Sequence, residues 1–314
     1  MMKKIATRDA YGRALARLGG EKADLVVLDA DLAKSTKTID FAKVYPERFF
    51  DMGIAEQNLM GTAAGLAAVG KIPFASTFAM FATGRAFEQI RNSIAYPKLN
   101  VKIAATHAGI TVGEDGASHQ TVEDIALMRV LPNMTVIVPA DGPETEGAIR
   151  WAAEHEGPVY IRLGRLGVPV INDEESYRFT PGKAVTLRQG RDVSLIATGL
   201  MVSIALEAAA ALAAEAIEAE VLNIHTIKPI DAESILDSAV RTGCVVTAEE
   251  HSVIGGLGSA VAEVLGEGQP VPLERVGLKD TFGESGKPDL LLKKYGLTAE
   301  AVADAARRAM ARKG

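Results

Sequence analysis

The stretch KIPFASTFAMFATGRAFEQIRNSIAYPKLNVKIAATH, residues 71–107, contains a strand, a helix and a second strand in that order. Residues 71–77 and 100–107 form short runs that are apolar on both faces, as expected for strands covered by helices on both sides. Between them, Phe87, Ile90 and Ile94 recur at spacings of three and four, which predicts an amphipathic helix over 84–95. This order predicts a parallel crossover unit.

The same alternation extends in both directions from this unit. The residue pattern predicts further strands over 24–31, 134–140 and 158–163, and further helices over 55–69, 121–130 and 142–154. The helix over 121–130 opens with Thr-Val-Glu-Asp, which resembles a capping box with Thr121 as the N-cap and Asp124 in the third position.

A weakly patterned stretch, 166–192, interrupts the rhythm with two prolines and the polar run NDEES, and predicts a linker with a short hairpin. Strands are then expected over 193–198, 221–227 and 244–248, and helices over 203–216, over 259–265 and from Thr298. The fold class is therefore α/β, with two doubly wound α/β domains. We place them at residues 1–170 and 192–314, joined by a linker over 171–191.

The composition excludes several classes of protein. The 314 residues are 48% hydrophobic and 24% charged, which is ordinary for a globular protein and not for a disordered or fibrous one. The net charge is -6, so no global basic field gathers nucleic acid or anionic lipid. The single cysteine, Cys244, favours a reducing compartment, and we expect a cytoplasmic protein. We expect no membrane span, because no run of about 20 apolar residues occurs.

Three glycine-bearing loops are candidate functional sites, and the first two lie where a helix begins. GGLGSA at 255–260 is an incomplete dinucleotide fingerprint with no strand leading directly into it, so it favours a tight packing turn over a nicotinamide site. GIAEQN at 53–58 places Glu56 where a strand ends and a helix begins. Ligands of α/β folds bind at that edge, although a first-turn glutamate stabilised by the helix dipole remains the alternative.

The third loop, THAGITVGEDGASHQ at 106–120, holds two of the five histidines. His107 ends a predicted strand, and Asp115 and His119 lie in glycine-rich chain that can approach a small ligand closely. The spacing matches no zinc site. A polar surface loop is the alternative, but a loop of this length between a strand and a helix is usually functional when it is ordered.

Taken together, these segments resemble the C-terminal half of the transketolases over nearly the whole chain. The most specific stretches are DADLAKST, DMGIAEQNLMGTAAGLA, STFAMFATGRAFEQIR, ATHAGITVGEDGASHQTVEDIALMR, VIVPADGPETEGAI and YIRLGR. The resemblance implies a pyrimidine-binding domain followed by the family's C-terminal domain. It also implies the thiamine-diphosphate-dependent transfer of a two-carbon ketol unit between sugar phosphates, as in the pentose phosphate pathway.

The resemblance also implies roles for individual residues. Glu56 would bind a ring nitrogen of the aminopyrimidine, Phe78 and Phe81 would pack around that ring, and Asp31 would support the site beside the cofactor. Glu56, His107 and His119 are the residues expected to take part in catalysis.

Substrate contacts follow from the same resemblance. His107 and His119 would contact sugar hydroxyls, with His119 also moving protons, and Asp115 would read the stereochemistry of the acceptor. Arg165, Arg8 and Ser35 would hold the sugar phosphate, since the planar guanidinium binds phosphate oxygens in pairs. Arg162 is a nearby alternative to Arg165.

One family motif is missing. Transketolases hold the diphosphate through Mg²⁺ bound at a Gly-Asp-Gly motif, which this sequence lacks; the nearest strings are Glu-Asp-Gly at 114–116 and Ala-Asp-Gly at 140–142. We therefore expect no metal ligand in this chain. We expect a natural subunit that pairs with a separate N-terminal, diphosphate-binding subunit as an α2β2 heterotetramer, with little activity alone.

Other readings stay open. A deoxyxylulose-phosphate synthase shares GIAEQ but generally carries aspartate in place of His107, and its halves are normally fused. The beta subunit of a 2-oxo-acid dehydrogenase fits the length but lacks the GEDG-x-x-HQ loop. A non-catalytic assembly subunit would have no need for Glu56, His107, Asp115 and His119 together.

Overall fold

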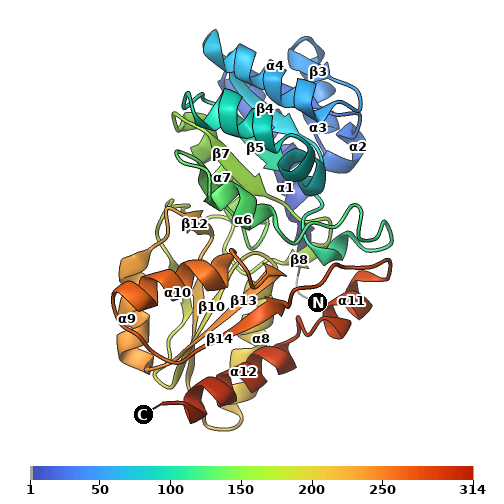
Figure 1. Cartoon of the computed structure of the whole chain (residues 1–314). Coiled ribbons are helices and arrows are strands. Elements are labelled where there is room, and N and C mark those ends of the chain that lie inside the picture. Colours follow the sequence, from blue (N-terminus) through green and yellow to red (C-terminus); the bar gives the residue numbers. More distant parts are fainter. Residues whose placement is uncertain (1–2, 314) are drawn as a thin grey trace.

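The computed structural model describes residues 3–313 and forms two α/β halves, which lie one above the other in Figure 1. The first half is built on a seven-stranded sheet of order β12-β6-β7-β5-β4-β2-β3, in which only the pairing of β12 with β6 is antiparallel. Its strands are β2 (Leu25–Asp29), β3 (Phe49–Asp51), β4 (Ile72–Ser76), β5 (Lys102–Ala105), β6 (Thr135–Ile137), β7 (Val159–Arg162) and β12 (Thr226–Lys228).

Helices cover both faces of this sheet, because successive side chains of a buried strand point to opposite faces. Val27 of β2 packs in the cluster of α1 (Thr7–Glu21) and α7 (Gly142–Glu154), whereas Val26 packs in the cluster of α4 (Glu56–Ala68). The remaining helices of this half are α2 (Ala33–Thr36), α3 (Ile39–Ala42), α5 (Phe87–Gln89) and α6 (Asp124–Arg129), with short turns η1 (Pro46–Arg48), η2 (Phe81–Arg85), η3 (Ile90–Ala95) and η4 (Ile110–Val112).

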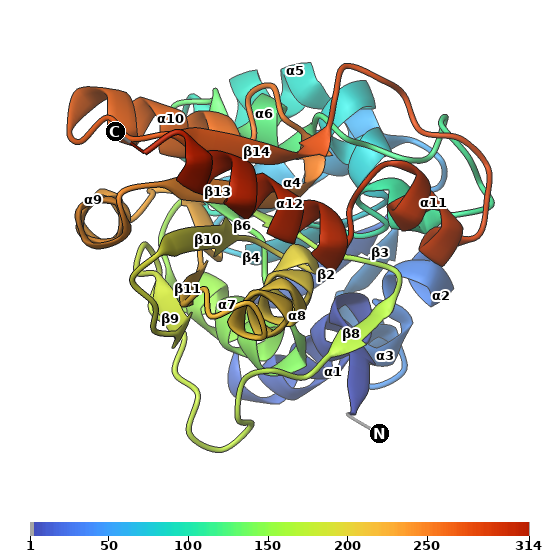
Figure 2. The same cartoon turned by 90° about the horizontal axis from the view of Figure 1, so that it is seen from below.

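The second half is a five-stranded sheet of order β14-β13-β10-β11-β9, with β9 antiparallel to β11. Helices α8 and α12 lie side by side on one face, seen from below in Figure 2. The elements are β9 (Val185–Arg188), β10 (Val193–Ala197), α8 (Met201–Ala213), β11 (Ala219–Asn223), α9 (Ala232–Thr242), β13 (Val245–Ser252), α10 (Leu257–Glu267), β14 (Leu273–Leu278), α11 (Pro288–Lys294) and α12 (Ala299–Ala311). The α/β class and the two doubly wound units expected from the sequence are confirmed.

The linker contains no hairpin, contrary to the prediction. β8 (Gly167–Pro169) pairs with β1 (Lys4–Ala6) in a small separate sheet, while β9 pairs with β11 of the second sheet. The strand predicted over 221–227 is also divided, because its last residues leave β11 and add β12 to the edge of the first sheet. The two halves are thus connected through a strand as well as through the linker.

Two predicted helices are also corrected. The segment 84–95 contains the wide π-helical turns η2 and η3 around α5 rather than one regular helix, although Ile90 and Ile94 are buried as the periodicity required. α6 begins at Asp124 instead of following an N-cap at Thr121, whose hydroxyl donates to Glu123 Oε2. No helix among residues 3–313 combines the length and the apolar character that a membrane span requires.

Candidate active site

The predicted site residues follow the carboxyl ends of neighbouring parallel strands. Asp31 follows β2, Phe78 follows β4 and His107 follows β5, so the loops that carry them emerge at one edge of the sheet. A bridge between Phe78 and Thr106 holds the loop after β4 against the loop after β5. The crossover unit therefore places Phe78 beside His107.

Glu56 is the first residue of α4 and is 1% exposed. Arg85 Nη1 donates to its Oε2 at 2.6 Å, and the Thr77 hydroxyl lies 3.4 Å from Oε1. The same guanidinium covers the ring of Phe81 at 4.6 Å. Oε2 is thus neutralised by Arg85, while Oε1 has only a long contact and is free to bind a further donor. No local pattern in the sequence points to Arg85.

Four of the predicted residues form one aromatic cluster. The imidazole of His107 stacks on Phe78 with ring centroids 3.8 Å apart, and Phe78 is stacked on Phe81 at 6.0 Å. His119 meets Phe81 edge-on at 5.2 Å. This cluster gives the site a flat, largely apolar wall with two imidazoles in it.

His107 is held as a neutral imidazole with a defined tautomer. Arg8 Nη1 lies 3.2 Å from its Nε2, and since a guanidinium can only donate, Nε2 accepts and the proton resides on Nδ1, 2.9 Å from the Thr106 hydroxyl. Burial, with the positive charges of Arg8 and Arg165, lowers the pKa of His107 to about 3. Its φ of 57° is unusual for a residue other than glycine.

Arg8 and Arg165 make a positive corner beside this neutral ring. Arg8 Nη1 also donates to the carbonyl of Ser35 at 3.0 Å, and burial together with the charge of Arg165 lowers its pKa. No carboxylate among residues 3–313 forms an ion pair with Arg8, and Arg165 has only Glu114 at 3.3 Å. Two neighbouring guanidinium groups, of which only Arg165 is paired with a carboxylate, suit a phosphate.

Arg162, the alternative to Arg165, is not available for a substrate. It is 7% exposed, and its Nε and Nη2 donate to the buried carboxylate of Asp124 at 2.7 and 3.1 Å. Nη2 also donates to the carbonyl of Glu250 at 2.9 Å. Arg162 is therefore an internal connection between the two halves.

Asp115 and Asp31 are exposed, and neither side chain makes a hydrogen bond within the described residues 3–313. Asp31 has a φ of 60°, and its N–H donates to Asp51 Oδ1 at 3.1 Å. The neighbouring Asp29 is buried instead; burial raises its pKa to about 6, although the hydroxyls of Thr36 and Thr38 and the N–H of Leu32 donate to it. The roles of Asp115 and Asp31 stay predictions.

The glycine loop at 255–260 has no room for a nucleotide phosphate at its helix. The buried carboxylate of Glu249 accepts from the N–H groups of Leu257 and Gly258 at 2.7 and 2.8 Å. A side chain at Gly256 would collide with this carboxylate. The start of α10 is therefore occupied by the chain's own Glu249, which supports the packing interpretation.

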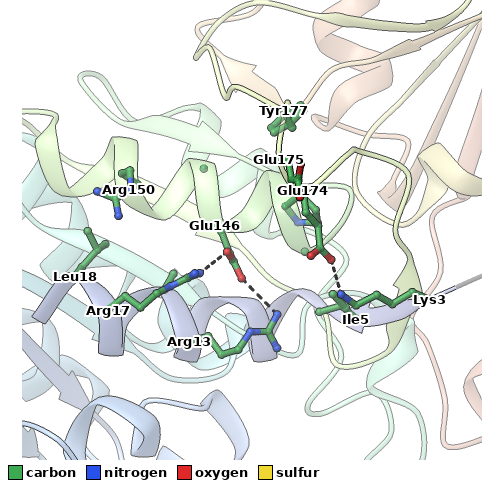
Figure 3. Close-up of a pocket in the computed structure, with 14 residues that line it drawn as sticks. Lys3, Ile5, Arg13, Arg17, Leu18, Glu146, Arg150, Glu174, Glu175 and Tyr177 are labelled. Carbon is green, nitrogen blue, oxygen red and sulfur yellow. Dashed lines mark hydrogen bonds and ion pairs between the residues drawn. The ribbon is translucent and has the colours of Figure 1, made fainter. Parts of the chain in front are cut away.

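A separate cavity lies away from the aromatic cluster. It has a volume of about 660 Å³ and lies between α1, α7 and the segment 174–177 (Figure 3). Its cations are already paired: Arg13 and Arg17 with Glu146, and Lys3 with Glu174. Because Arg150 is likewise paired with Glu21, the positive charges of this cavity are already compensated, and it is a weaker candidate than the edge that holds Glu56 and His107.

The fold and the site define a two-domain α/β chain of the kind that carries an active site at the carboxyl edge of a parallel sheet. Residues 3–170 match the family profile of the transketolase pyrimidine-binding domain, and residues 182–302 match that of the transketolase C-terminal domain. The chain belongs to the transketolase family, whose members depend on thiamine diphosphate.

Similar proteins span nearly the same length. A Methanocaldococcus jannaschii protein named as a transketolase C-terminal section is 56% identical, with 94% of this chain and 93% of that protein covered. A 6-deoxy-6-sulfo-D-fructose transketolase subunit of a Clostridium species is 49% identical over 98% of this chain and 95% of its own. A solved split-gene transketolase, described as an inactive β4 tetramer, superposes with a TM-score of 0.93 at 64% identity, covering 99% of this chain and 100% of that one.

Proposed function

We propose that this chain is the C-terminal subunit of a split, thiamine-diphosphate-dependent transketolase that moves a two-carbon ketol unit between sugar phosphates. A separate N-terminal subunit would supply the diphosphate site and its Mg²⁺, and the active form would be an α2β2 heterotetramer. The observation that carries this proposal is the placement of His107, neutral and stacked on Phe78, against the guanidinium of Arg8.

The residues present fit one part of the cofactor. Glu56 offers a buried carboxylate oxygen with only a long contact to Thr77, and Phe78 and Phe81 offer stacked aromatic surface nearby, which together suit a flat heteroaromatic ring with a proton-bearing nitrogen. When bound, thiamine diphosphate would supply the carbanion chemistry that cleaves and forms the carbon–carbon bond. Glu56 would orient its ring by accepting a hydrogen bond at Oε1.

The substrate would lie along the aromatic wall. Arg8 and Arg165 would bind the phosphate, with the Ser35 carbonyl holding Arg8 in place. His107 would orient a sugar hydroxyl when that hydroxyl replaces Arg8 as the donor to Nε2, and its neutral ring would add no charge. His119 would accept or return a proton from a second hydroxyl. Asp115 would contact the acceptor, and Asp31 would flank the cofactor.

The requirement for a partner rests on three observations. The sequence has no Gly-Asp-Gly motif, and residues 3–313 contain no group of three His, Cys, Asp or Glu side chains that could hold a metal ion. The similar split-gene protein is described as inactive in its β4 form. A cytoplasmic location is proposed with it, since the one cysteine, Cys244, is a buried free thiol.

A second candidate substrate follows from the Clostridium relative, whose name specifies a 6-deoxy-6-sulfo-fructose. A sulfonate is an anion that two guanidinium groups would bind much as they bind a phosphate. The reaction class would be unchanged, and only the donor ketose would differ.

The test is two-carbon transfer from xylulose 5-phosphate, or from the sulfonated ketose, to ribose 5-phosphate with thiamine diphosphate and Mg²⁺. Activity only after mixing with a diphosphate-binding subunit supports the proposal, and activity of the chain alone contradicts the need for a partner. Glu56→Gln should lower the reconstituted rate at least about 100-fold, on the scale of general acid–base groups. Formation of deoxyxylulose 5-phosphate from pyruvate and glyceraldehyde 3-phosphate would favour the synthase reading, and 2-oxo-acid decarboxylation would favour the dehydrogenase reading. No activity in any mixture would favour the non-catalytic reading.

A further inference from the structure

We propose that Glu250, in the C-terminal half, is a positioning residue that holds the loop 107–120 where its side chains meet the substrate. The catalytic meaning of this inference rests on the proposed function, but the contact itself does not. Figure 1 shows the loop at the boundary between the halves, beside α11.

The contact is direct and buried. Glu250 is 5% exposed on β13, and its Oε1 accepts the backbone N–H of Thr111 at 2.7 Å. Gly109 has a φ of 82°, and a side chain there would collide with the Glu250 carboxylate. The carboxylate therefore fills the space beside Gly109 and fixes the backbone between His107 and Thr111.

Glu250 is itself held from the other side. Its carbonyl accepts from Arg162 Nη2 at 2.9 Å, and Arg162 is paired with Asp124 of α6. The small cavity that Thr111, Arg162 and Glu250 help to line has a volume of about 30 Å³. A cavity of this size holds about one or two water molecules and leaves the carboxylate little free space.

The far end of the loop has a second attachment to the same half. Gln120 Nε2 donates to the carbonyls of Ile110, Gly113 and Glu284 at 3.1, 3.2 and 2.9 Å, and the Ser285 hydroxyl donates to the carbonyl of Glu114 at 2.6 Å. The loop backbone is thus fixed at both ends, while Asp115 between them stays exposed. Fixing the backbone of a binding loop in advance lowers the entropy lost when substrate is positioned.

The variant Glu250→Met tests this, because methionine keeps the volume but removes the acceptor. Glu250→Gln keeps an acceptor oxygen, and Glu215→Ala removes a surface carboxylate of the same half that is ion-paired with Arg307. In the free chain, amide hydrogen exchange of residues 109–120 should rise roughly tenfold or more in Glu250→Met, as expected for a lost buried hydrogen bond, and stay within about threefold in the other two. In the reconstituted enzyme, kcat/KM for the sugar phosphates should fall by a similar factor, with unchanged half-saturation by thiamine diphosphate.

Each outcome decides something. Unchanged loop exchange in Glu250→Met, or equal loosening in Glu250→Gln, would overturn the positioning role. A loosened loop with unchanged kcat/KM would show that the contact does not serve catalysis. If the wild-type mixture transfers no two-carbon unit, the proposed function fails, while the exchange measurement still decides whether Glu250 holds the loop.

Discussion

Arg162 and Arg165 are three residues apart, and the structure predicts opposite effects when each is changed to methionine. Arg162 neutralises Asp124, a carboxylate that is 0% exposed and whose other hydrogen bond comes from the Tyr160 hydroxyl at 2.6 Å. Removing one partner of a buried ion pair costs about 3–5 kcal/mol, because the remaining charge is left without compensation. We expect Arg162→Met to lower the free energy of unfolding by that amount.

The loss should depend on pH. Burial by itself would raise the pKa of Asp124, but the charge and hydrogen bonds of Arg162 outweigh it and hold that pKa below its ordinary value. A carboxyl whose pKa is lower in the folded chain stabilises the fold at pH values above its pKa in the unfolded chain. That contribution is lost as the pH falls. Without Arg162 the carboxyl has to ionise in an apolar interior as the pH rises, so the difference between wild type and variant should grow from acid to neutral pH.

Arg165→Met should instead change substrate binding. The Arg165 side chain is 36% exposed and its partner Glu114 is 59% exposed, so the ion pair between them contributes about 0–1 kcal/mol. The free energy of unfolding should change by no more than that. In the reconstituted enzyme KM for phosphorylated sugars should rise by about tenfold or more, as for a lost charge-assisted hydrogen bond, with little effect on unphosphorylated ones.

Urea denaturation of the free chain, followed by circular dichroism at pH 5 and 8, measures the first effect, and KM measures the second. The double variant Asp124→Leu/Arg162→Met should recover much of the lost stability, because both charges are then absent. A loss below about 1 kcal/mol in Arg162→Met, or a KM effect confined to Arg162→Met, would refute the assignment of the two arginines.

Three further predictions concern the loop, a buried acid and the acceptor. Gly109→Ala should destabilise the chain by about 1–3 kcal/mol in urea denaturation, because of its φ of 82° and the collision with Glu250, whereas Gly266→Ala in open helical surroundings should not. Burial raises the pKa of Glu144 to about 7, so its contribution to the free energy of unfolding is complete below pH 4.5 and is lost as the pH rises to 7. The free energy of unfolding of the wild type should therefore decline by about 3 kcal/mol across that window, and Glu144→Gln should remove this decline. An unchanged pH dependence in the variant would contradict the shift. Asp115→Ala should weaken discrimination between acceptor sugars more than it weakens cofactor binding, and the reverse pattern in steady-state kinetics would refute its role.

The strands of the first sheet could be predicted because their signal is local. The run 71–77 is apolar on both faces and becomes β4, with its last four residues buried. The failures came where a distant group decides. The strand predicted over 221–227 divides because β6 of the other half offers an edge for Thr226–Lys228. α6 starts late because the carbonyl of Thr121 accepts from the N–H of Gly109 at 2.9 Å, in a bridge between the two segments.

The candidate site divides in the same way. Glu56, Phe78, Phe81, His107 and His119 carry motifs that can be recognised in the sequence, and the structure brings them to one edge of the sheet. Arg85 and Glu250 were missed, since their partners lie 29 and 139 residues away and no local pattern reports such pairs. The side chains that face a ligand are thus visible in the sequence, whereas those that hold them in place depend on the fold.

This division gives a physical reason for the way the proposed enzyme is split. Within residues 3–313 the aromatic cluster is built by the first half alone. The loop that carries Asp115 and His119 is nevertheless fixed by Glu250 of the second half, through a buried hydrogen bond. A buried contact of this kind loses its hydrogen bond if the halves separate, and the unpaired groups then cost free energy. The edge beside Glu56 is more open, since Arg85 is half exposed and Ile54 is 77% exposed. In the proposed enzyme, a partner that supplies only the diphosphate site would associate at that edge, and having both halves on one chain would keep Glu250 against the substrate loop.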